Sequence, residues 1–219
     1  MRELFQADLK SLGDQLSEIA SLVRVAMEQA RTALETADVE LAETVITNDA
    51  RIDYLQNALD EKAIELLALQ GPVATDLRTV VAALRMSTSL ERMGDLARHI
   101  AQLTRMRYPE HVLPESRRES FAAMAEAAVA VASEVEQLLK THDLDHASQV
   151  VKINSQINDI HAENFKAIAA EDWSASAVTT ADVTLASRYL ERFADHGVSV
   201  ARKVTYLVTG EWEPHVQSA

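Results

Sequence analysis

Hydrophobic residues recur every three or four positions along most of the chain, which is the spacing of one face of an α-helix. Two clear stripes are Ala83, Met86, Leu90, Met93, Ala97 and Ile100, and then Ala186, Leu190, Phe193, Gly197 and Val200. No alternating run flanked by turn residues has the pattern of a strand. The periodicity therefore predicts an all-α protein.

Breaks in this pattern divide the chain into six expected helices, at residues 3–35, 38–70, 73–106, 115–141, 143–171 and 175–209. Asp38, Asp143 and Ser174 stand near the starts of three of them, and their side chains can cap a helix N-terminus. The segment RYPEHVLPES holds two of the four prolines and is the strongest interruption. We expect the chain to divide there.

The second half of the chain repeats the order of the first. ERMGD at 91–95 returns as ERFAD at 191–195, and VELAETVITNDARID at 39–53 has its counterpart in LDHASQVVKINSQIN at 144–158. We therefore expect two tandem three-helix bundles related by internal duplication. The first covers 1–108 and the second 115–210, with a Pro-containing linker at 109–114 and a tail at 211–219.

Composition narrows the class of protein. The 219 residues are 47% hydrophobic and 25% charged, as in an ordinary globular protein, and the absence of Cys excludes disulfides and thiolate chemistry. A net charge of −13, shared evenly by the two halves, argues against nucleic-acid binding and fits cations or basic partners. Since no stretch is apolar enough to span a membrane and the start lacks a signal peptide, we expect a cytoplasmic protein without direct membrane insertion.

Pairs of acidic residues are the candidate chemistry. Glu91 and Asp95 lie four apart, so they share a helix face outside the apolar stripe, and Asp49 and Asp53 do the same one helix earlier. Antiparallel packing across the short break at 70–72 would bring the two pairs to one groove. Carboxylates so placed repel unless they are protonated or neutralised, and a bound cation neutralises them.

All-oxygen ligation favours a hard cation such as Mg²⁺, Ca²⁺, Mn²⁺ or ferric iron. His99 comes round to the acidic side one turn later and is a further candidate ligand. The alternative is a solvated acidic face, with Arg92 and Arg98 as surface ion-pair partners. Neither the Glu-x-x-His spacing of di-iron oxidases nor a nucleophile or phosphate-loop motif is present.

Two segments carry a resemblance to a known family. NDARIDYLQNALDEKAIELLALQGPVATDLRTVVAALRMSTSLERMGDLARHIA resembles the first repeat of PhoU-type phosphate-signalling regulators, and RYLERFADHGVSVARKVTYLVTGE resembles the end of their second repeat. The combination of P-x-A-x-D-L-R with L-E-R-x-G-D is specific, although either fragment alone is not. The resemblance covers about residues 5 to 211.

This resemblance implies tandem three-helix bundles with metal ions (iron, zinc, manganese or magnesium) held on the surface by E/D-x-x-x-D pairs. It also implies a cytoplasmic adaptor, commonly a homodimer, that represses the phosphate-starvation response. The implied partners are the ATPase of the Pst phosphate ABC transporter and the phosphate-sensing histidine kinase.

Carried over residue by residue, the family's metal ligands match this chain at Asp49, Asp53, Glu91, Asp95, Glu191 and Asp195. The fifth helix departs from the family pattern, because Asn154 and Asn158 stand where two Asp residues are usual. An amide oxygen coordinates but carries no charge, so we expect the second site to bind its cation more weakly, or not at all. The family's Gly is kept at Gly94 but replaced by Ala194.

With this resemblance, the sequence implies a negative regulator of the phosphate-starvation response that binds metal and is not an enzyme. Two alternatives stay open at this point. One is a metal-dependent phosphoester hydrolase that uses metal-bound water. The other is a plain helical scaffold without metal.

Overall fold

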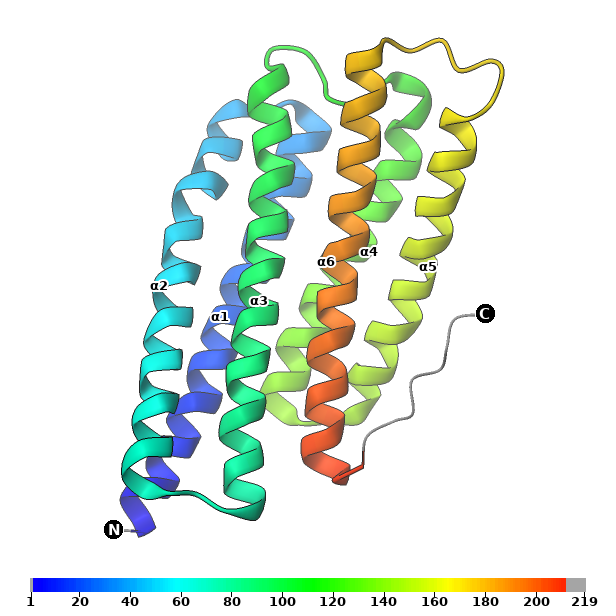
Figure 1. Cartoon of the computed structure of the whole chain (residues 1–219). Helices are drawn as coiled ribbons and strands as arrows, with labels where there is room; N and C mark the ends of the chain where they lie inside the picture. The colour runs from blue at the N-terminus through cyan, green and yellow to red at the C-terminus, as the bar shows by residue number, and fades with distance from the viewer. Residues whose placement is uncertain (1, 212–219) are drawn as a thin grey trace.

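The computed structural model describes residues 2–211 and consists of six helices with no strand in that range (Figure 1). They are α1 (Arg2–Thr36), α2 (Val39–Gln70), α3 (Ala74–Arg107), α4 (Glu115–Thr141), α5 (Leu144–Ile168) and α6 (Ala177–Thr209). The predicted all-α class and the six long helices are confirmed. Apart from Glu211, the expected tail lies outside the described residues.

Two of the three predicted helix caps are confirmed. Asp38 accepts a hydrogen bond from the backbone N–H of Leu41 at 2.9 Å, and Asp143 accepts one from Asp145 at 3.0 Å. The prediction for Ser174 is wrong, because Ser176 is the residue that caps α6. Helix α5 ends at Ile168, earlier than expected, and the loop that follows is held by a hydrogen bond from the Trp173 indole to a threonine of α6.

The helices form two groups of three that stand side by side. Helices α1–α3 make the first group and α4–α6 the second (Figure 1). The groups meet through equivalent helices, since α1 packs on α4 and α3 packs on α6, while α2 and α5 form the two outer edges. One continuous apolar core runs through both groups, and no described helix is long and apolar enough to cross a membrane.

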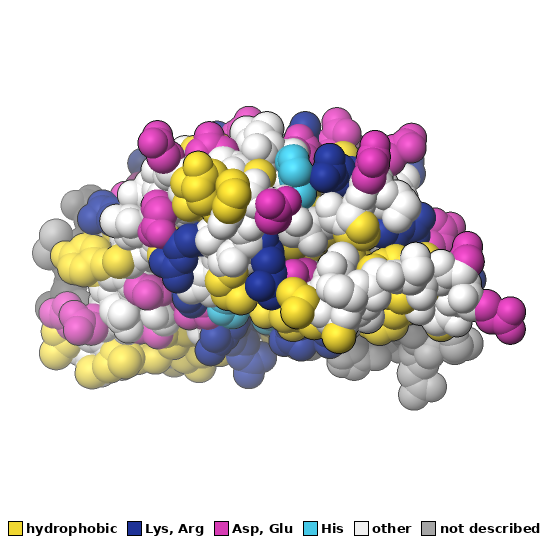
Figure 2. All heavy atoms as spheres, turned by 90° about the horizontal axis from the view of Figure 1, so that it is seen from above, with side chains coloured by type: hydrophobic (Ala, Val, Ile, Leu, Met, Phe, Trp, Pro, Cys, Tyr) yellow, Lys and Arg dark blue, Asp and Glu magenta, His cyan; other side chains and the backbone are white. Residues whose placement is uncertain are grey.

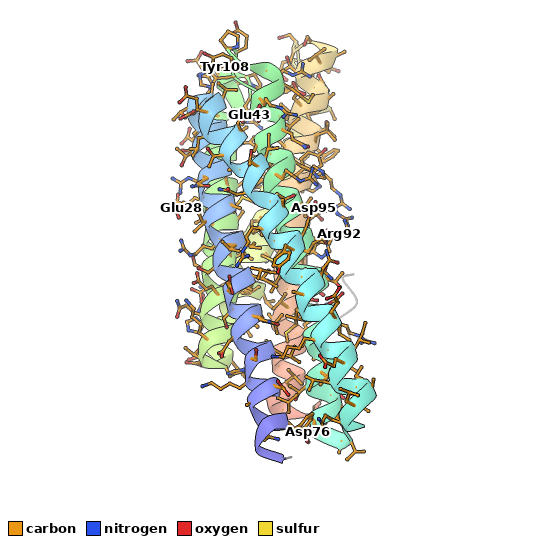
Figure 3. All side chains as sticks on the ribbon, turned by 90° about the vertical axis from the view of Figure 1, so that its left-hand side faces the viewer. Glu28, Glu43, Asp76, Arg92, Asp95 and Tyr108 are labelled. Carbon is orange, nitrogen blue, oxygen red and sulfur yellow. The ribbon has the colours of Figure 1, made fainter. Side chains whose placement is uncertain are left out.

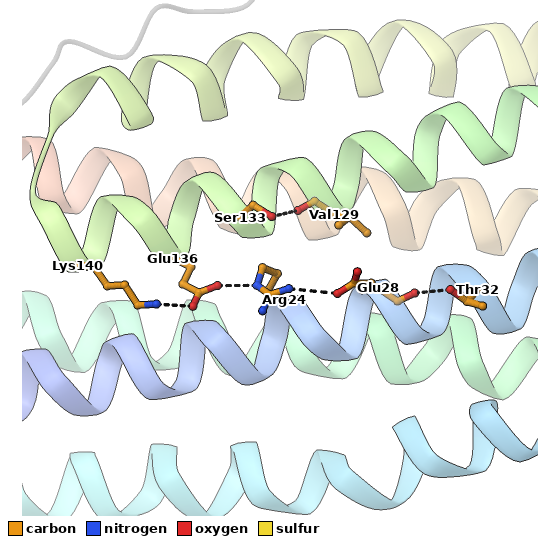
Figure 4. A network of polar contacts seen from close by, with 7 residues as sticks. All are labelled: Arg24, Glu28, Thr32, Val129, Ser133, Glu136 and Lys140. Carbon is orange, nitrogen blue, oxygen red and sulfur yellow. Dashed lines mark hydrogen bonds and ion pairs between the residues drawn. The ribbon is translucent and has the colours of Figure 1, made fainter.

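Ion pairs with buried carboxylates join the two groups. Arg24 of α1 contacts Glu136 of α4 at 2.6 Å, and Lys140 contacts the same carboxylate (Figure 4). Burial raises the pKa of Glu136, but the hydrogen bonds from Lys140 and Arg24 outweigh it, so the net pKa is lowered and the group is ionised. At the α3–α6 contact, Arg107 binds both carboxylate oxygens of Asp182, at 2.6 and 3.0 Å.

The linker between the groups is packed rather than free. Val112 and Leu113 are buried with 3% and 6% of their surfaces exposed. Together with the ion pairs, this packing joins the two repeats where α1 meets α4 and α3 meets α6.

Candidate metal centre and its counterpart in the second repeat

Site 1 consists of Asp49 and Asp53 on α2 with Glu91 and Asp95 on α3. The small Gly94 lets the two helices approach at this level. A Cβ atom added there would lie 2.9 Å from the terminal methyl of Ile52 and 3.4 Å from a carboxylate oxygen of Asp49. The close approach brings Asp49 toward the face of α3 that carries Asp95.

An arginine stands between the two helices. The Nε of Arg98 lies 2.5 Å from a carboxylate oxygen of Asp49, and its terminal nitrogen donates a short hydrogen bond to Asp95. Arg92 binds the other oxygen of Asp95 at 2.9 Å and lies beside it at the edge of α3 (Figure 3). The guanidinium of Arg98 therefore supplies the positive charge that the sequence assigned to a metal.

Negative charge is still in excess around this arginine. Burial raises the pKa of Asp49, although the charge of Arg98 partly offsets it. Burial and the neighbouring Asp95 raise the pKa of Glu91. Burial also acts to raise the pKa of Asp95, but the hydrogen bond and charge of Arg98 lower it overall. Two of the four carboxyl groups are thus held in surroundings that disfavour their charge.

The other two predicted residues of site 1 lie at its margins. Asp53 is exposed, and its charge acts on both Asp49 and Glu91. The ring of His99 packs against Tyr189 of α6, with the ring centroids 5.0 Å apart. Burial and then the charge of Arg98 lower its pKa, so the imidazole is neutral. His99 therefore belongs to the contact between the repeats as much as to site 1.

The donor chemistry of site 1 fits a hard cation, because four carboxylates supply only oxygen. The arrangement seen here is closed around a guanidinium instead. Within residues 2–211, no group of three or more His, Asp or Glu side chains is placed to hold a metal ion. A metal at this site would have to displace Arg98.

Site 2 brings together fewer charges. Glu191 and Asp195 share a face of α6, and the amide of Asn154 on α5 donates to Asp195 at 3.3 Å. Arg188, on the same helix, contacts Glu191 at 2.5 Å. Burial and then Asp195 raise the pKa of Glu191. Asn158 is exposed on the outer edge, next to this group along α5.

Sequence reasoning placed the acidic pairs on α3 and α6, but it did not foresee that Arg98 would bind Asp49 and Asp95 at the centre of site 1. Its spacing of three residues from Asp95 is a helix ion-pair spacing and was the available signal. The second repeat has Val198 at the matching position, 100 residues later.

The carbonyl oxygen of Asn154 is buried without a hydrogen-bond partner, so this amide is only half satisfied.

These features define a duplicated helical-bundle protein with acidic pairs at matching places in its two halves. The PhoU domain model matches the chain twice, over residues 16–104 and 121–204, and the chain therefore belongs to the PhoU family. The double match agrees with the duplication predicted from the sequence. The family resemblance is confirmed.

Named relatives extend over nearly the whole chain. It is 40% identical over 210 residues to phosphate-specific transport system accessory protein PhoU homolog 2 of Mycobacterium tuberculosis, covering 96% of this chain and 99% of the relative. PhoU homolog 1 of Mycobacterium leprae is 39% identical over 212 residues, with coverage of 97% and 96%.

Solved structures agree with this assignment. The crystal structure of the phosphate transport system regulatory protein PhoU from Streptococcus pneumoniae superposes with a TM-score of 0.82 at 27% identity, covering 96% of this chain and 99% of that one. PhoU from Pseudomonas aeruginosa gives the same TM-score at 25% identity, with coverage of 94% and 100%.

Proposed function

We propose that this protein is a negative regulator of the phosphate-starvation response, acting as a cytoplasmic adaptor. It would modulate uptake by the Pst ABC transporter through its ATPase and signalling by the phosphate-sensing histidine kinase. The observation that carries this proposal is the full-length similarity, through both repeats, to proteins named as accessory to phosphate-specific transport. Two repeats packed side by side offer separate outer faces, which suits an adaptor that contacts two partners.

Deleting the gene in its host tests the regulatory part. Phosphate-starvation genes should turn on in phosphate-rich medium, and a plasmid copy of the intact chain should silence them again. Deleting the kinase gene as well should remove the effect, because the signal is proposed to pass through the kinase. Genes that stay silent after the first deletion would show that the chain is no repressor.

The proposal includes a hard metal ion at site 1, held by Asp49, Asp53, Glu91 and Asp95 in place of Arg98. The bound ion would supply a multivalent positive centre that relieves the repulsion among these carboxylates. The raised pKa values of Asp49 and Glu91 support this. So does the guanidinium of Arg98, because it shows that a positive group is accommodated between α2 and α3.

Metal content measured on protein never exposed to a chelator tests the site. The double variant Asp49→Asn with Asp53→Asn should lose the metal. The variant Glu61→Gln with Glu65→Gln is the matched control, because it removes an exposed acidic pair with the same spacing from the same helix. No metal above background in the intact chain, with melting unchanged by added cations, would favour the plain scaffold.

We also propose that the protein acts by contact rather than catalysis. Purified protein supplied with Mn²⁺ or Mg²⁺ should not hydrolyse p-nitrophenyl phosphate above the rate of the metal alone. Turnover that disappears in Glu91→Ala would instead establish the metal-dependent hydrolase.

A homodimer completes the proposal. Its support is an outer edge on α2 that exposes large apolar side chains, with Tyr54 at 63%, Ile64 at 59% and Leu69 at 71%. Sedimentation equilibrium should give twice the chain mass, and Ile64→Glu should give a monomer. A monomeric intact chain would contradict the homodimer and leave the regulatory and metal-binding proposals unaffected.

A further inference from the structure

A cavity lies between α5 and α6 near the C-terminal end of α6, where these two helices run side by side in opposite directions (Figure 1). It encloses about 440 Å³. Sites that hold organic groups usually enclose roughly 300–1,000 Å³. We call this cavity the α5–α6 groove, and its walls include Leu144, Ala147 and Val151 of α5 and Ala201, Arg202 and Thr209 of α6.

The α5–α6 groove presents apolar surface to water. Ala147 and Ala201 are buried in its walls, whereas Val151 keeps 48% of its surface exposed. No segment within residues 2–211 covers this side of the groove. An apolar side chain laid there would remove the exposed surface from water and be stabilised by doing so.

The charge of the groove is positive. Among residues 2–211, Arg202 is the charged residue in its walls, and it is exposed and makes no ion pair with another of these residues. The surface is different elsewhere: Figure 2 shows acidic and basic side chains interspersed over the end of the bundle where α6 begins. The groove therefore suits an apolar segment that carries a negative charge.

The chain leaves α6 at one end of this groove. Gly210 has a φ of 76°, in the left-handed region that commonly ends helices, and its N–H donates to the carbonyl of Tyr206 at 2.9 Å. The hydroxyl of Thr209, in the wall of the groove, accepts from the N–H of Glu211 at 3.2 Å and donates to the Glu211 carbonyl at 3.3 Å. The segment that begins at residue 212 thus follows from a backbone held at the groove.

The sequence of that segment has the pattern of an extended chain with one apolar side. Trp212, Pro214 and Val216 alternate with Glu213 and His215. Successive side chains of an extended chain point to opposite sides, so the three apolar residues would share one side. A proline also disfavours the helical conformation in the residue before it, which here is Glu213.

The segment matches the groove in length. The four steps from residue 212 to residue 216 span about 13 Å of extended chain. The seven residues of α6 from Thr209 back to Arg202 span about 10 Å. A segment that runs back along α6 from Glu211 would bring Glu213 within reach of the long side chain of Arg202, and opposite charges would meet there.

We propose that the α5–α6 groove binds residues 212–216 of its own chain. Trp212, Pro214 and Val216 pack on the apolar walls, and Glu213 pairs with Arg202. The segment covers the groove, so a partner segment with the same alternation binds there only by displacing it. The proposal does not depend on metal binding or on phosphate transport.

Tryptophan fluorescence tests this docking in the full chain. Trp173→Phe leaves Trp212 as the one tryptophan of the 219 residues. Its emission should lie at a shorter wavelength than that of the free peptide EWEPHVQSA, and acrylamide should quench it less, because a docked indole is shielded from water. The same emission and quenching in the chain as in the peptide would overturn the proposal.

Variants in the Trp173→Phe background locate the segment. Arg202→Glu and Val151→Glu place a negative charge in the groove, so the ratio of docked to free segment should fall about fivefold or more, seen as a shift toward the emission of the peptide. Lys10→Glu is the matched control for the first, because Lys10 lines a second cavity that α6 also borders. Val178→Glu, an exposed valine at the start of α6, is the control for the second. Circular dichroism checks that each variant folds.

Competition tests whether the groove is occupied in the intact chain. Fluorescein-labelled EWEPHVQSA, followed by anisotropy, should bind the variant Trp212→Ser at least about tenfold more tightly than the intact chain, because the chain's own segment no longer competes. Equal binding to both chains would overturn the proposal. So would exposure of Trp212 by Lys10→Glu as large as by Arg202→Glu, which would assign the segment to the second cavity, or shielding that disappears on dilution, which would assign it to a second copy.

Discussion

The two repeats carry the same acidic pair but neutralise it in different ways. In the first repeat, Arg98 reaches between helices and binds Asp49 and Asp95 together. In the second, valine stands at the position of that arginine, and Asn154 offers Asp195 an amide hydrogen instead. Site 1 is a charged contact between two helices, whereas the charges of site 2 lie on α6 alone.

The comparison of site 1 with site 2 shows which residues are absent together from the second repeat. Removing one member of a buried charge pair leaves the other without a partner and is costly, but removing both is nearly neutral. The second repeat lacks both the arginine and the two Asp residues of the outer helix. Helix α6 carries Glu191 and Asp195. The arginine and the two further carboxylates that surround the matching pair in the first repeat are all missing here.

The largest expected effect is on cation affinity. Glu91→Gln with Asp95→Asn should weaken Mn²⁺ binding by more than about a hundredfold, because charged oxygen ligands set the strength of such sites. Glu191→Gln with Asp195→Asn should change it by less than about threefold, because the amides of α5 add no charge. Calorimetric titration of both variants checks this, and equal losses would make the two sites equivalent.

Arg98→Val gives site 1 the residue found in site 2. Without metal it should lower the free energy of unfolding by about 2–3 kcal/mol, because Asp49 is 7% exposed and would lose its partner. Added Mn²⁺ should restore the loss and bind about tenfold more tightly, since the guanidinium no longer competes.

The control for this variant is Arg51→Val, whose arginine pairs with Glu18 on the surface. Its cost should stay below about 1 kcal/mol. Urea unfolding with and without metal measures both. If Arg98→Val bound metal no better than the intact chain, guanidinium and metal would not share one place.

The helices and the acidic faces were predictable because both depend on local spacing. The three- and four-residue steps placed the six helices within a few residues and put Asp49 and Asp95 on facing sides. The periodicity within one helix carries no information about distances between helices. It could not show that Arg98 reaches Asp49, or that His99 packs against Tyr189, because the second contact depends on how the repeats pack.

A double-mutant cycle in the second repeat sharpens the comparison. Asn154→Asp alone should cost about 1–2 kcal/mol, because it sets a carboxylate against Asp195 and removes a donor. Adding Val198→Arg should recover at least about 1 kcal/mol of this, a coupling that two independent changes would not show. Val198→Arg in the intact chain supplies the other side of the cycle. Strict additivity would mean that α5 and α6 cannot form the contact seen in the first repeat.

The smallest effect concerns a buried serine in each repeat. Ser87 donates to Asp60 at 3.0 Å, whereas its counterpart Ser187 contacts Nδ1 of His161 at 2.8 Å. Burial, followed by the charge of Arg188, lowers the pKa of His161 in the folded state. The unfolded chain therefore binds this proton first, so the stabilisation is complete above the unfolded pKa of about 6.5 and is lost as the pH falls below it.

Of the two serine contacts, only that of the second repeat should show this histidine-dependent loss, while His99 and His196, whose pKa values burial also lowers, add separate losses of the same sign. Between neutral pH and pH about 5.5 it should amount to less than about 1 kcal/mol, or a fall in Tm of less than about 3 °C, because solvent screens the partly exposed ring. His161→Gln should flatten that part of the curve of Tm against pH. His142→Gln, at the exposed end of α4, is the matched control. Equal flattening by both variants would assign the dependence to overall charge, and the polar contacts of Ser87 and Ser187 would then respond alike to acid.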